Sequence, residues 1–532
     1  MTEFSAPELS LSTTTLMSWG GDDRITLDER SGLNSYGCSP KPTATLGYSS
    51  STASFIGAGA FAHVTSLHHQ LREAVREGDP YSVYERYLTA TAARLQSCYD
   101  LPESADIVFG PSGTDLEYIA LACSLQVSSK VCNIVVEVDE VGSGCQHSQA
   151  GRYFAPRTAL GLDVTKGDAL PGFEPGSIRV ETVPMRSASG AVICEEAHAD
   201  LLDVAIRNAL ASGERPLLHV VHRSKTGLVL PSWPVLERLA KTHSDDLDIV
   251  VDACQGRISP AMIARYLDCN ASLLLTGSKF IGGPPFSGFA ILSPSVSTRM
   301  RAADDLPRGL AAFFSRAELS HRWPAAMALD PVANFGLLLR MEAGLFELER
   351  LLALDNDRVG AVIGALTRVM EHLPDDLPFQ LHSCATSGSL PVETGHPLDS
   401  QSLFVIAFKD ELLADCPIDF DDARMIYRML YSDLSDRFSD PQDQITAADI
   451  CHLGQPVRCL RHGEGWRPTL RISLSAGQIA DLSGLSPERL ETRFRSDIAR
   501  IGAKIRLAVD LLKANRAPEN FAAIKALVEQ GG

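Results

Sequence analysis

Four segments of the sequence place polar side chains directly after short apolar runs. The most distinctive is Lys279, which follows the run 271–276 and two small residues and precedes a turn rich in glycine and proline. An ammonium at the end of a buried strand can be desolvated, which lowers its pKa and makes the amine nucleophilic. The alternative is a lysine whose charged end reaches solvent, the usual outcome for a single lysine.

The other three segments offer an acid, an anion site and a polar loop. Asp252 follows the segment DIVV at 248–251, the end of an expected buried strand, where a carboxylate must be paired; a helix cap or a structural ion pair is the alternative. Residues 111–115 read Pro-Ser-Gly-Thr-Asp before a helical pattern, so their backbone N–H groups can approach an anion, although an ordinary N-cap has the same composition. Residues 223–227, Arg-Ser-Lys-Thr-Gly, by themselves indicate only a polar loop.

An alternation of strands and helices must position these segments. Near-continuous Val, Ile and Leu in the strands favours a mainly parallel sheet with helices on both faces. In such a sheet, ligands bind beyond the carboxyl ends of the strands, where all four segments fall. Strands are expected at 105–110, 131–138, 216–222, 246–253, 271–277 and 288–292, and helices at 81–98, 113–127, 195–213, 231–243 and 260–267.

The pattern changes near residue 325, which predicts a second domain. Long helices then dominate, at 333–354, 357–373 and 500–514, with strands at 402–408 and 469–475. We expect an irregular N-terminal segment 1–75, a large domain 76–325 and a smaller α+β domain 326–532.

Composition narrows the class of protein. Of 532 residues, 45% are hydrophobic and 21% charged, which is typical of a globular chain. The net charge of -18 argues against an electrostatic nucleic-acid binder. The twelve cysteines lack metal-ligand spacing, so we expect no metal site. No apolar run approaches about 18 residues, so we expect no membrane contact. Because no leader peptide is visible, we expect a cytoplasmic location.

An amine, a carboxylate, an anion cradle and a hydrogen-bonding loop at one sheet edge match the needs of pyridoxal 5′-phosphate (PLP). This cofactor needs a lysine Schiff base, a phosphate site and an acid beside its pyridine nitrogen. Gly282 and Gly283 would let the backbone pass close to it. A nucleotide-binding oxidoreductase would instead need Gly-x-Gly-x-x-Gly between a strand and a helix, which does not occur near the first strand.

The same segments resemble fold-type I PLP-dependent enzymes of the class V aminotransferase and cysteine desulfurase branch. The resemblance implies that family's fold: an α/β large domain with a mainly parallel seven-stranded sheet, and a smaller α+β domain. The motifs occur in family order over residues 105–295, with weaker similarity after them and little over the first 75 residues. The family's strand that ends in Asp-x-x-Gln is similar to VVDACQGRIS, and its Ser-x-x-Lys or Ser-His-Lys segment is similar to TGSKFIGGPPFSGFAIL. The family's Asn/Ser-x-Thr-Gly loop is similar to HRSKTGLVLP, and its phosphate loop is similar to GPSGTDLE.

The resemblance also implies roles for individual residues. Lys279 would carry the Schiff base and Asp252 would pair with the pyridinium nitrogen, so both would be catalytic. Arg471, in TLRISLS, would clamp a substrate carboxylate, with a buried structural arginine as the alternative. Asn34 and Tyr36 are further substrate candidates, because the N-terminal segment commonly lines the substrate mouth in this fold. The remaining cofactor contacts would be Ser112, Gly113, Thr114, Thr276 and Ser278 at the phosphate, Gln255 and Ser224 at the ring's 3-oxygen, and Ala253 on a ring face.

Two features depart from the family pattern. The branch often stacks a histidine on the ring, but this chain has Asp-Glu-Val-Gly-Ser at 139–143 and His147 only later, so the stacking residue is unassigned. Cys451 precedes Arg471 without the small-residue loop of a desulfurase, which disfavours that activity.

The expected function is a PLP-dependent enzyme that acts on an α-amino acid, similar to class V aminotransferases. A biosynthetic or specialised role is expected, because the flanking regions do not match a common aminotransferase. A lyase, a replacement enzyme or a carbon–carbon bond-forming enzyme on the same fold is the alternative, and a non-catalytic binding protein is another. The fold implies a homodimer, with Arg316 as a candidate contact to the neighbouring subunit.

Overall fold

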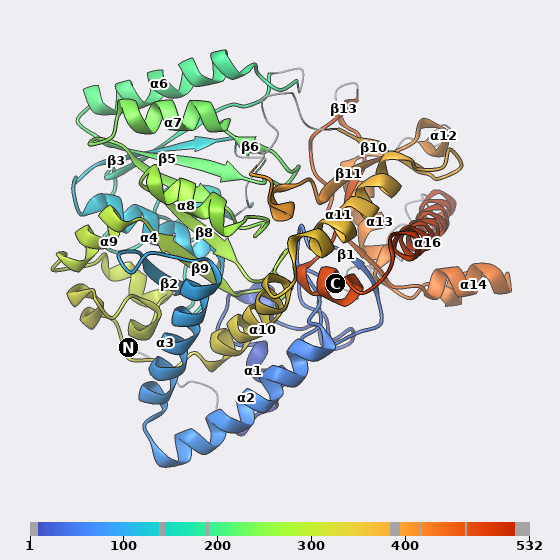
Figure 1. The fold of residues 1–532 in the computed structure, drawn as a ribbon, viewed down its shortest axis with the longest axis horizontal. Helices are drawn as coiled ribbons and strands as arrows, with labels where there is room; N and C mark the ends of the chain where they lie inside the picture. The colour runs from blue at the N-terminus through green and yellow to red at the C-terminus, as the bar shows by residue number, and fades with distance from the viewer. Residues whose placement is uncertain are drawn as a thin grey trace.

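The chain forms two main sheets, each with its own hydrophobic core, with one long helix between them (Figure 1). The structure, a computed structural model, describes residues 9–137, 140, 142, 144–187, 191–383, 394–413, 418–462 and 465–515. The long helix, α10 (Phe335–Leu352), buries Leu348 in the core of the large domain and Leu351 in that of the small domain.

The larger sheet is mainly parallel, as the sequence predicted. Its strands follow the order β2-β9-β8-β7-β5-β3-β4, so a path of seven strands forms the sheet. Within this path, β9 runs antiparallel to both of its neighbours and the other pairs are parallel. The bounds are β2 Asp106–Gly110, β3 Val131–Val136, β4 Ile178–Val183, β5 Arg215–His222, β7 Asp248–Asp252, β8 Ala271–Thr276 and β9 Gly288–Leu292, with β6 Val229–Leu230 paired to β5.

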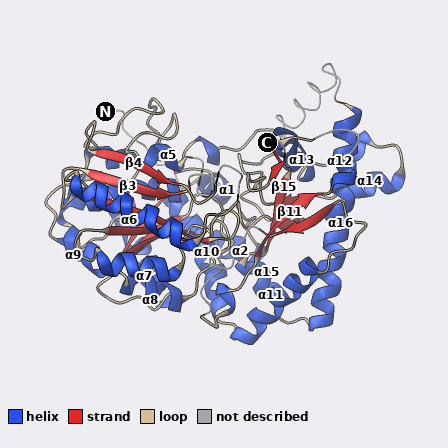
Figure 2. Ribbon diagram, turned by 90° about the horizontal axis from the view of Figure 1, so that it is seen from above, coloured by secondary structure: helices blue, strands red, loops and turns tan. Residues whose placement is uncertain are grey.

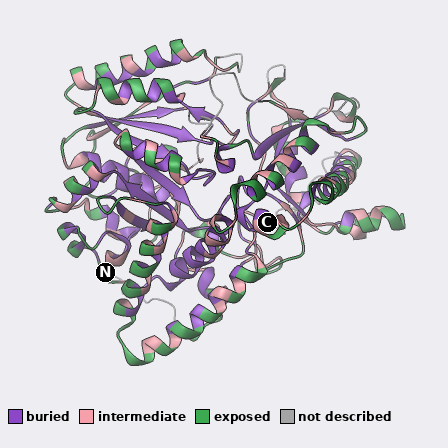
Figure 3. Cartoon of the chain, in the orientation of Figure 1, coloured by how far each residue is buried: buried purple, intermediate pink, exposed green. Residues whose placement is uncertain are grey.

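Helices cover both faces of this sheet because successive strand residues point to opposite sides. On β5, Leu218 and Val220 belong to one core, whereas Leu217 belongs to the other. Apart from the edge strand β4, the strands are largely buried, while the outer faces of the helices are exposed (Figure 3). One layer contains α4 (Gly113–Leu125) and α9 (Pro294–Arg301); the other contains α6 (Glu195–Ala211), α7 (Trp233–Thr242) and α8 (Pro260–Asp268).

The small domain is built on an antiparallel sheet of the order β10-β11-β15. It lies beside the large domain when the molecule is seen from above (Figure 2). The two strands predicted from the sequence are β11 (Leu403–Phe408) and β15 (Thr469–Ser473), next to β10 (Phe379–His382). Its other elements are α11 (Asn356–Glu371), α12 (Asp410–Leu413), α13 (Phe420–Leu430), α14 (Pro441–Ala448), α15 (Ala476–Leu482), α16 (Pro487–Ala514), β12 (Cys451–Leu453), β13 (Arg461–His462) and β14 (Gly465–Trp466).

The N-terminal part is more regular than the sequence indicated. The expectation of an irregular segment is wrong for α2 (Ala58–Glu77), which packs against α10 and leads into α3 (Pro80–Cys98), the helix predicted at 81–98. A short helix, α1 (Thr13–Met17), precedes it, and β1 (Leu46–Tyr48) pairs in parallel with β12 of the small domain. The N-terminal segment therefore contacts both domains.

Two further observations concern the described residues. Every cysteine in the described ranges is a free thiol. No helix among the described residues is both long and apolar enough to cross a bilayer.

A buried carboxyl group in the large domain gives a pH-dependent stability. Glu318 is fully buried, accepts from Tyr84 Oη and Ser315 N, and has its pKa raised by burial from 4.5 to about 8. The folded chain thus keeps a proton on Glu318 that the unfolded chain releases near pH 4.5. The contribution of this proton to the free energy of unfolding is therefore fully present below pH 4.5 and is lost as the pH rises through about 8.

We expect Glu318→Gln to flatten the fall in the thermal unfolding midpoint between pH 6 and pH 9. Glutamine can accept from Ser315 N–H and donate to Tyr84 Oη, so it mimics the protonated acid. Midpoints of both proteins across this pH range test the effect. Parallel pH profiles for the wild type and the variant would contradict it.

Candidate active site

A cavity of about 380 Å³ lies at the carboxyl ends of the parallel strands and is closed on one side by the small domain. The loops after β2, β5, β7 and β8 all contribute to its wall, so the four segments singled out in the sequence converge there. The lining includes most predicted site residues: Tyr36, Ser112, Gly113, Thr114, Ser224, Asp252, Gln255, Thr276, Ser278, Lys279 and Arg471.

The N-terminus of α4 forms one corner of the cavity. Ser112 caps the helix and donates its hydroxyl to Asp115, whose pKa is raised to about 7 by burial and by Asp22. A Cβ on Gly113 would lie 2.4 Å from Cys254 Sγ, so only glycine fits between that thiol and the helix start. Backbone N–H groups and the helix dipole make this corner suited to an anion.

Lys279 lies in the turn after β8, where the N-terminal segment fixes the backbone. Ser54 donates from its N–H to the Ser278 carbonyl (2.9 Å) and from its hydroxyl to the Lys279 carbonyl (2.6 Å). Both residues line the cavity. Thr276 also lines it, although its hydroxyl donates to the Cys254 carbonyl at 2.9 Å.

The glycines after Lys279 have a different role from the one expected. Neither Gly282 nor Gly283 is part of the cavity lining. A Cβ on Gly283 would lie 2.8 Å from the Gly344 Cα of α10, and Gly282 adopts a φ of +95°. These glycines permit a tight turn packed against α10, not an approach of the backbone to a bound cofactor.

Asp252, the last residue of β7, presents a carboxyl group at another wall of the cavity. Its Oδ1 accepts from Cys254 N at 3.0 Å. Behind it, burial lowers the pKa of His219 to about 4, and burial with the Asp252 charge raises the pKa of Glu117 well above its usual value. Burial thus favours the neutral forms of Glu117 and His219, which lie 3.5 Å apart and share a contact with Gln149.

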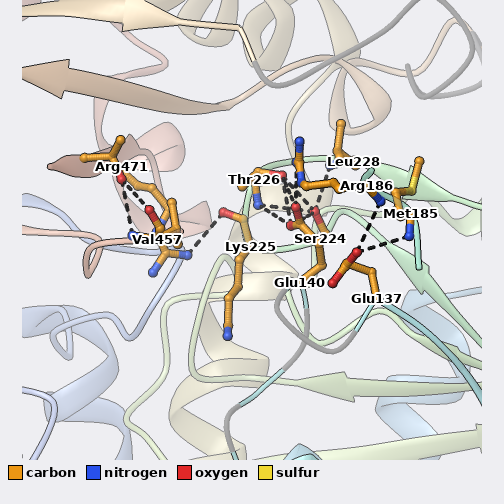
Figure 4. Close-up of polar contacts among 11 residues, drawn as sticks. Glu137, Glu140, Met185, Arg186, Ser224, Lys225, Thr226, Leu228, Val457 and Arg471 are labelled. Atoms are coloured by element: carbon orange, nitrogen blue, oxygen red, sulfur yellow. Dashed lines mark hydrogen bonds and ion pairs between the residues drawn. The ribbon is translucent and has the colours of Figure 1, made fainter. Parts of the chain in front are cut away.

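The loop after β5 is held by a buried carboxylate. Glu140 accepts from Ser224 Oγ at 2.7 Å, from Thr226 Oγ1 at 2.9 Å and from Arg186 Nη2 at 2.8 Å (Figure 4). Ser224 thus lines the cavity but donates its hydroxyl proton to Glu140. The Arg186–Glu140 ion pair and the hydroxyl groups of residues 224 and 226 hold this loop in place. They fix the direction of Lys225, which lies between the two hydroxyl residues.

Arg471 is a buried guanidinium whose hydrogen-bond partners are neutral. It donates to the carbonyls of Gln455, Ser51 and Lys225 and to Thr52 Oγ1. Within the described ranges no carboxylate pairs with it, and burial lowers its pKa to about 10. Ser51 Oγ, also in the lining, is buried without a hydrogen-bond partner among the described residues. A buried cation beside an unsatisfied hydroxyl is suited to a carboxylate ligand.

Gln255 is held in the lining by its neighbours. Its Nε2 donates to the Ser51 carbonyl at 3.0 Å, and its Oε1 accepts from Arg257 Nη1 at 3.0 Å. Ala253, by contrast, is buried but absent from the lining.

The two N-terminal candidates separate in the structure. Tyr36 lines the cavity and accepts from Arg24 Nη1 at 3.1 Å. Asn34 does not line it, because its Oδ1 accepts from the N–H groups of Tyr36 and Cys38 and so shapes a turn. Asn34 thus positions Tyr36.

Several lining residues escaped the sequence analysis. Arg24, Glu117, Glu140, Cys145 and Lys225 all face the cavity. Lys225 and Glu117 lay inside recognised motifs and could have been found there, whereas Arg24 lies in the unmatched N-terminal part. In the segment considered for ring stacking, Asp139, Val141 and Ser143 lie outside the described residues, and the lining contains Gly144 and Cys145 but not His147.

Comparison with solved structures supports the fold expected from the motifs. The chain is similar to the cysteine desulfurase CsdA from Escherichia coli, with a TM-score of 0.50 and 14% identity, covering 88% of this chain and 95% of that one. It is less similar to the ureidoglycine-glyoxylate aminotransferase from Bacillus subtilis, with a TM-score of 0.45 and 13% identity over 85% and 91% of the two chains. No family model and no curated protein matches the sequence. The likeness to CsdA shows that the chain has the fold-type I architecture.

Proposed function

We propose that the protein is a PLP-dependent enzyme that acts on the amino group of an α-amino acid, in the manner of class V aminotransferases. The observation that carries the proposal is the shared cavity of Lys279, Asp252, the α4 N-terminus and Arg471. These residues supply an amine, an acid, an anion cradle and a carboxylate clamp, the set that PLP and an amino acid need. The fold of the desulfurase CsdA supports the same assignment.

The lining residues fit the cofactor. Ser112, Gly113 and Thr114 would hold its phosphate, with Thr276 and Ser278 beside them, and Asp252 would face its ring nitrogen. Gly113 supports this placement, because the space for a Cβ is taken by Cys254 Sγ. When bound, PLP supplies an aldehyde that condenses with an amine and a ring that accepts electrons from the substrate's α-carbon.

The side chains of this chain then have separate tasks. The Lys279 amine would hold the cofactor and would move the proton at the substrate's α-carbon as base and acid. Asp252 would stabilise the protonated ring nitrogen, and burial favours the neutral forms of Glu117 and His219, so neither side chain would oppose that charge. Arg471 binds the α-carboxylate and so orients the α-carbon toward Lys279.

Transamination and elimination are separated by one experiment. After addition of an amino acid, a transaminase leaves its cofactor in the amine form, which absorbs at a shorter wavelength than the aldehyde form. A lyase or replacement enzyme returns to its starting spectrum as a leaving group is released. We expect accumulation of the amine form and a keto acid in equal amounts, and a spectrum that does not respond to any amino acid would contradict the proposed function.

Desulfurase activity is not part of the proposal. Cys451, the residue considered for it, is fully buried in β12, and burial raises its pKa to about 12. A thiol in that state is a poor nucleophile.

We also propose that the active enzyme is a homodimer, as is usual for this fold. Arg316 is not a strong candidate for the contact, since it donates to the carbonyls of Met327 and Leu329 within its own chain.

Gly113→Ala should weaken PLP binding by roughly 10- to 100-fold, because a displaced helix start loses hydrogen bonds to a charged phosphate. Titration of the apoprotein with PLP measures this effect. The double variant with Cys254→Ala should recover much of the affinity, since it removes the atom 2.4 Å from the new Cβ. Gly484→Ala, with nothing within 4 Å of its Cβ, is the control. Equal affinity in Gly113→Ala and wild type would argue against this phosphate site.

A further inference from the structure

The wall of the cavity opposite the sheet is strongly cationic. The small domain contributes three arginines to it: Arg424 from α13, Arg458 from the stretch after β12, and Arg471 from β15. Among the described residues, none of the small-domain lining residues is acidic. One arginine is enough for an α-carboxylate. Arg424 lies 3.7 Å from the Asp421 carboxylate, which offsets its charge, so Arg458 is the arginine that lies beyond what a simple amino acid needs.

The acidic lining residues that the structure describes do not balance these charges. Within the described ranges they are Glu117, Glu140 and Asp252, all from the large domain. Glu140 is already bonded to Ser224, Thr226 and Arg186. Burial and the charge of Asp252 raise the pKa of Glu117 and so favour its neutral form, and the proposed function reserves Asp252 for the cofactor ring.

Lys225, which follows β5 in the large domain, adds another cation to the cavity lining. Its N–H donates to the Glu140 carbonyl, and its own carbonyl accepts from Arg471, so its backbone is fixed between the two. Its side chain extends away from both the Glu140 hydrogen bonds and the Arg471 guanidinium (Figure 4). Lys225 lines the cavity together with Lys279.

The electrostatic surroundings of the Lys225 amine include both proposed substrate anchors. Burial lowers the pKa of Lys225, and the charges of Arg471 and Lys279 lower it further, whereas Glu140 and Cys145 oppose the shift. The amine is thus close enough to Arg471 and Lys279 for their charges to act on it. A substrate held by its α-carboxylate at Arg471 and its α-carbon at Lys279 would direct its side chain toward this region.

We propose that the substrate is an α-amino acid whose side chain ends in an anionic group, and that Lys225 is the residue that selects it. The inference rests on the proposed function and adds the substrate class to it. Arg458 also lines the cavity, where it would attract the same ligand, and it lies over the Phe420 ring at 4.8 Å. The distal anion can be a carboxylate or a phosphate, since both accept charge-assisted hydrogen bonds.

The test uses the PLP-loaded enzyme and three matched pairs of amino acids: L-glutamate with L-glutamine, L-aspartate with L-asparagine, and O-phospho-L-serine with L-serine. The change in the cofactor spectrum gives kcat/KM for each. We expect the wild type to prefer the anionic member of at least one pair. The pair with the largest ratio identifies the anion as carboxylate or phosphate.

Lys225→Met keeps the length of the side chain and removes its charge. We expect it to reduce the anionic-to-neutral ratio by roughly 10- to 100-fold, the range for loss of a charge-assisted hydrogen bond. Lys241→Met, on the exposed face of α7, should leave the ratio as in the wild type. An unchanged ratio in Lys225→Met, or a wild type that prefers the neutral members, would overturn the proposal.

The failure of this inference differs from failure of the proposed function. If the proposed function fails, the protein binds no cofactor that depends on Lys279. If only the inference fails, the cofactor is bound through Lys279 but no anionic amino acid is preferred.

Discussion

Lys279→Ala is expected to lower turnover by roughly ten-thousand-fold or more, because it removes both the attachment point and the group that moves the α-proton. The backbone contacts with Ser54 involve carbonyl oxygens of residues 278 and 279, so they survive the substitution. Single-turnover rates with the best amino acid measure the loss. An added primary amine, such as methylamine, should restore part of the rate by acting as the missing base.

A matched control separates this effect from a change in stability. Lys241→Ala, at an exposed position, should keep the wild-type rate. A Lys279→Ala protein that turns over within about tenfold of the wild type would show that this amine is not the catalytic base.

Asp252→Asn is expected to lower turnover by roughly 100-fold or more, because a neutral amide cannot hold the proton on a pyridine nitrogen. The substitution keeps an Oδ1 acceptor for Cys254 N, so the end of β7 retains its structure. Glu117 cannot replace the lost charge, because burial favours its neutral form. The measurement is the rate of α-proton exchange in deuterated water for both proteins.

A structural role for Asp252 predicts a different result. It would lower the unfolding temperature and leave the proton-exchange rate per folded, PLP-loaded molecule unchanged. That outcome would contradict the assignment of Asp252 to the ring nitrogen.

The convergence of the main site candidates on one cavity could be predicted from the sequence because of a property of parallel sheets. The carboxyl ends of β5, β7 and β8 meet at one edge, so residues that directly follow apolar runs must converge. Lys279 and Asp252 could be located this way without any knowledge of side-chain contacts.

The sequence predictions were wrong where a residue expected to contact a ligand instead stabilises the protein's own fold. Asn34 accepts from backbone N–H groups of its own turn, and Gly283 packs on α10. Neither contact can be predicted from a local sequence pattern, because each depends on a partner whose position is set by the tertiary fold.

Two elements were hidden by their composition. β4, whose residues 178–182 are exposed or only partly buried, was not predicted because an edge strand with little apolar burial has no continuous apolar run. In α2, the buried Val64, Leu67 and Leu71 recur at helical spacing, but they lie beside a stretch rich in Ser, Thr and Gly. Lys225 was read as part of a polar loop, since only the cavity shows which way its side chain extends.

The central claim is that one amine, Lys279, holds the cofactor, and peptide mapping after borohydride reduction tests it most directly. Reduction fixes the cofactor to whichever lysine carries it, and mass spectrometry identifies the peptide. The account predicts the added pyridoxyl phosphate mass on Lys279. The same mass on Lys225, the other lysine that lines the cavity among the described residues, or on no lysine at all, would contradict it.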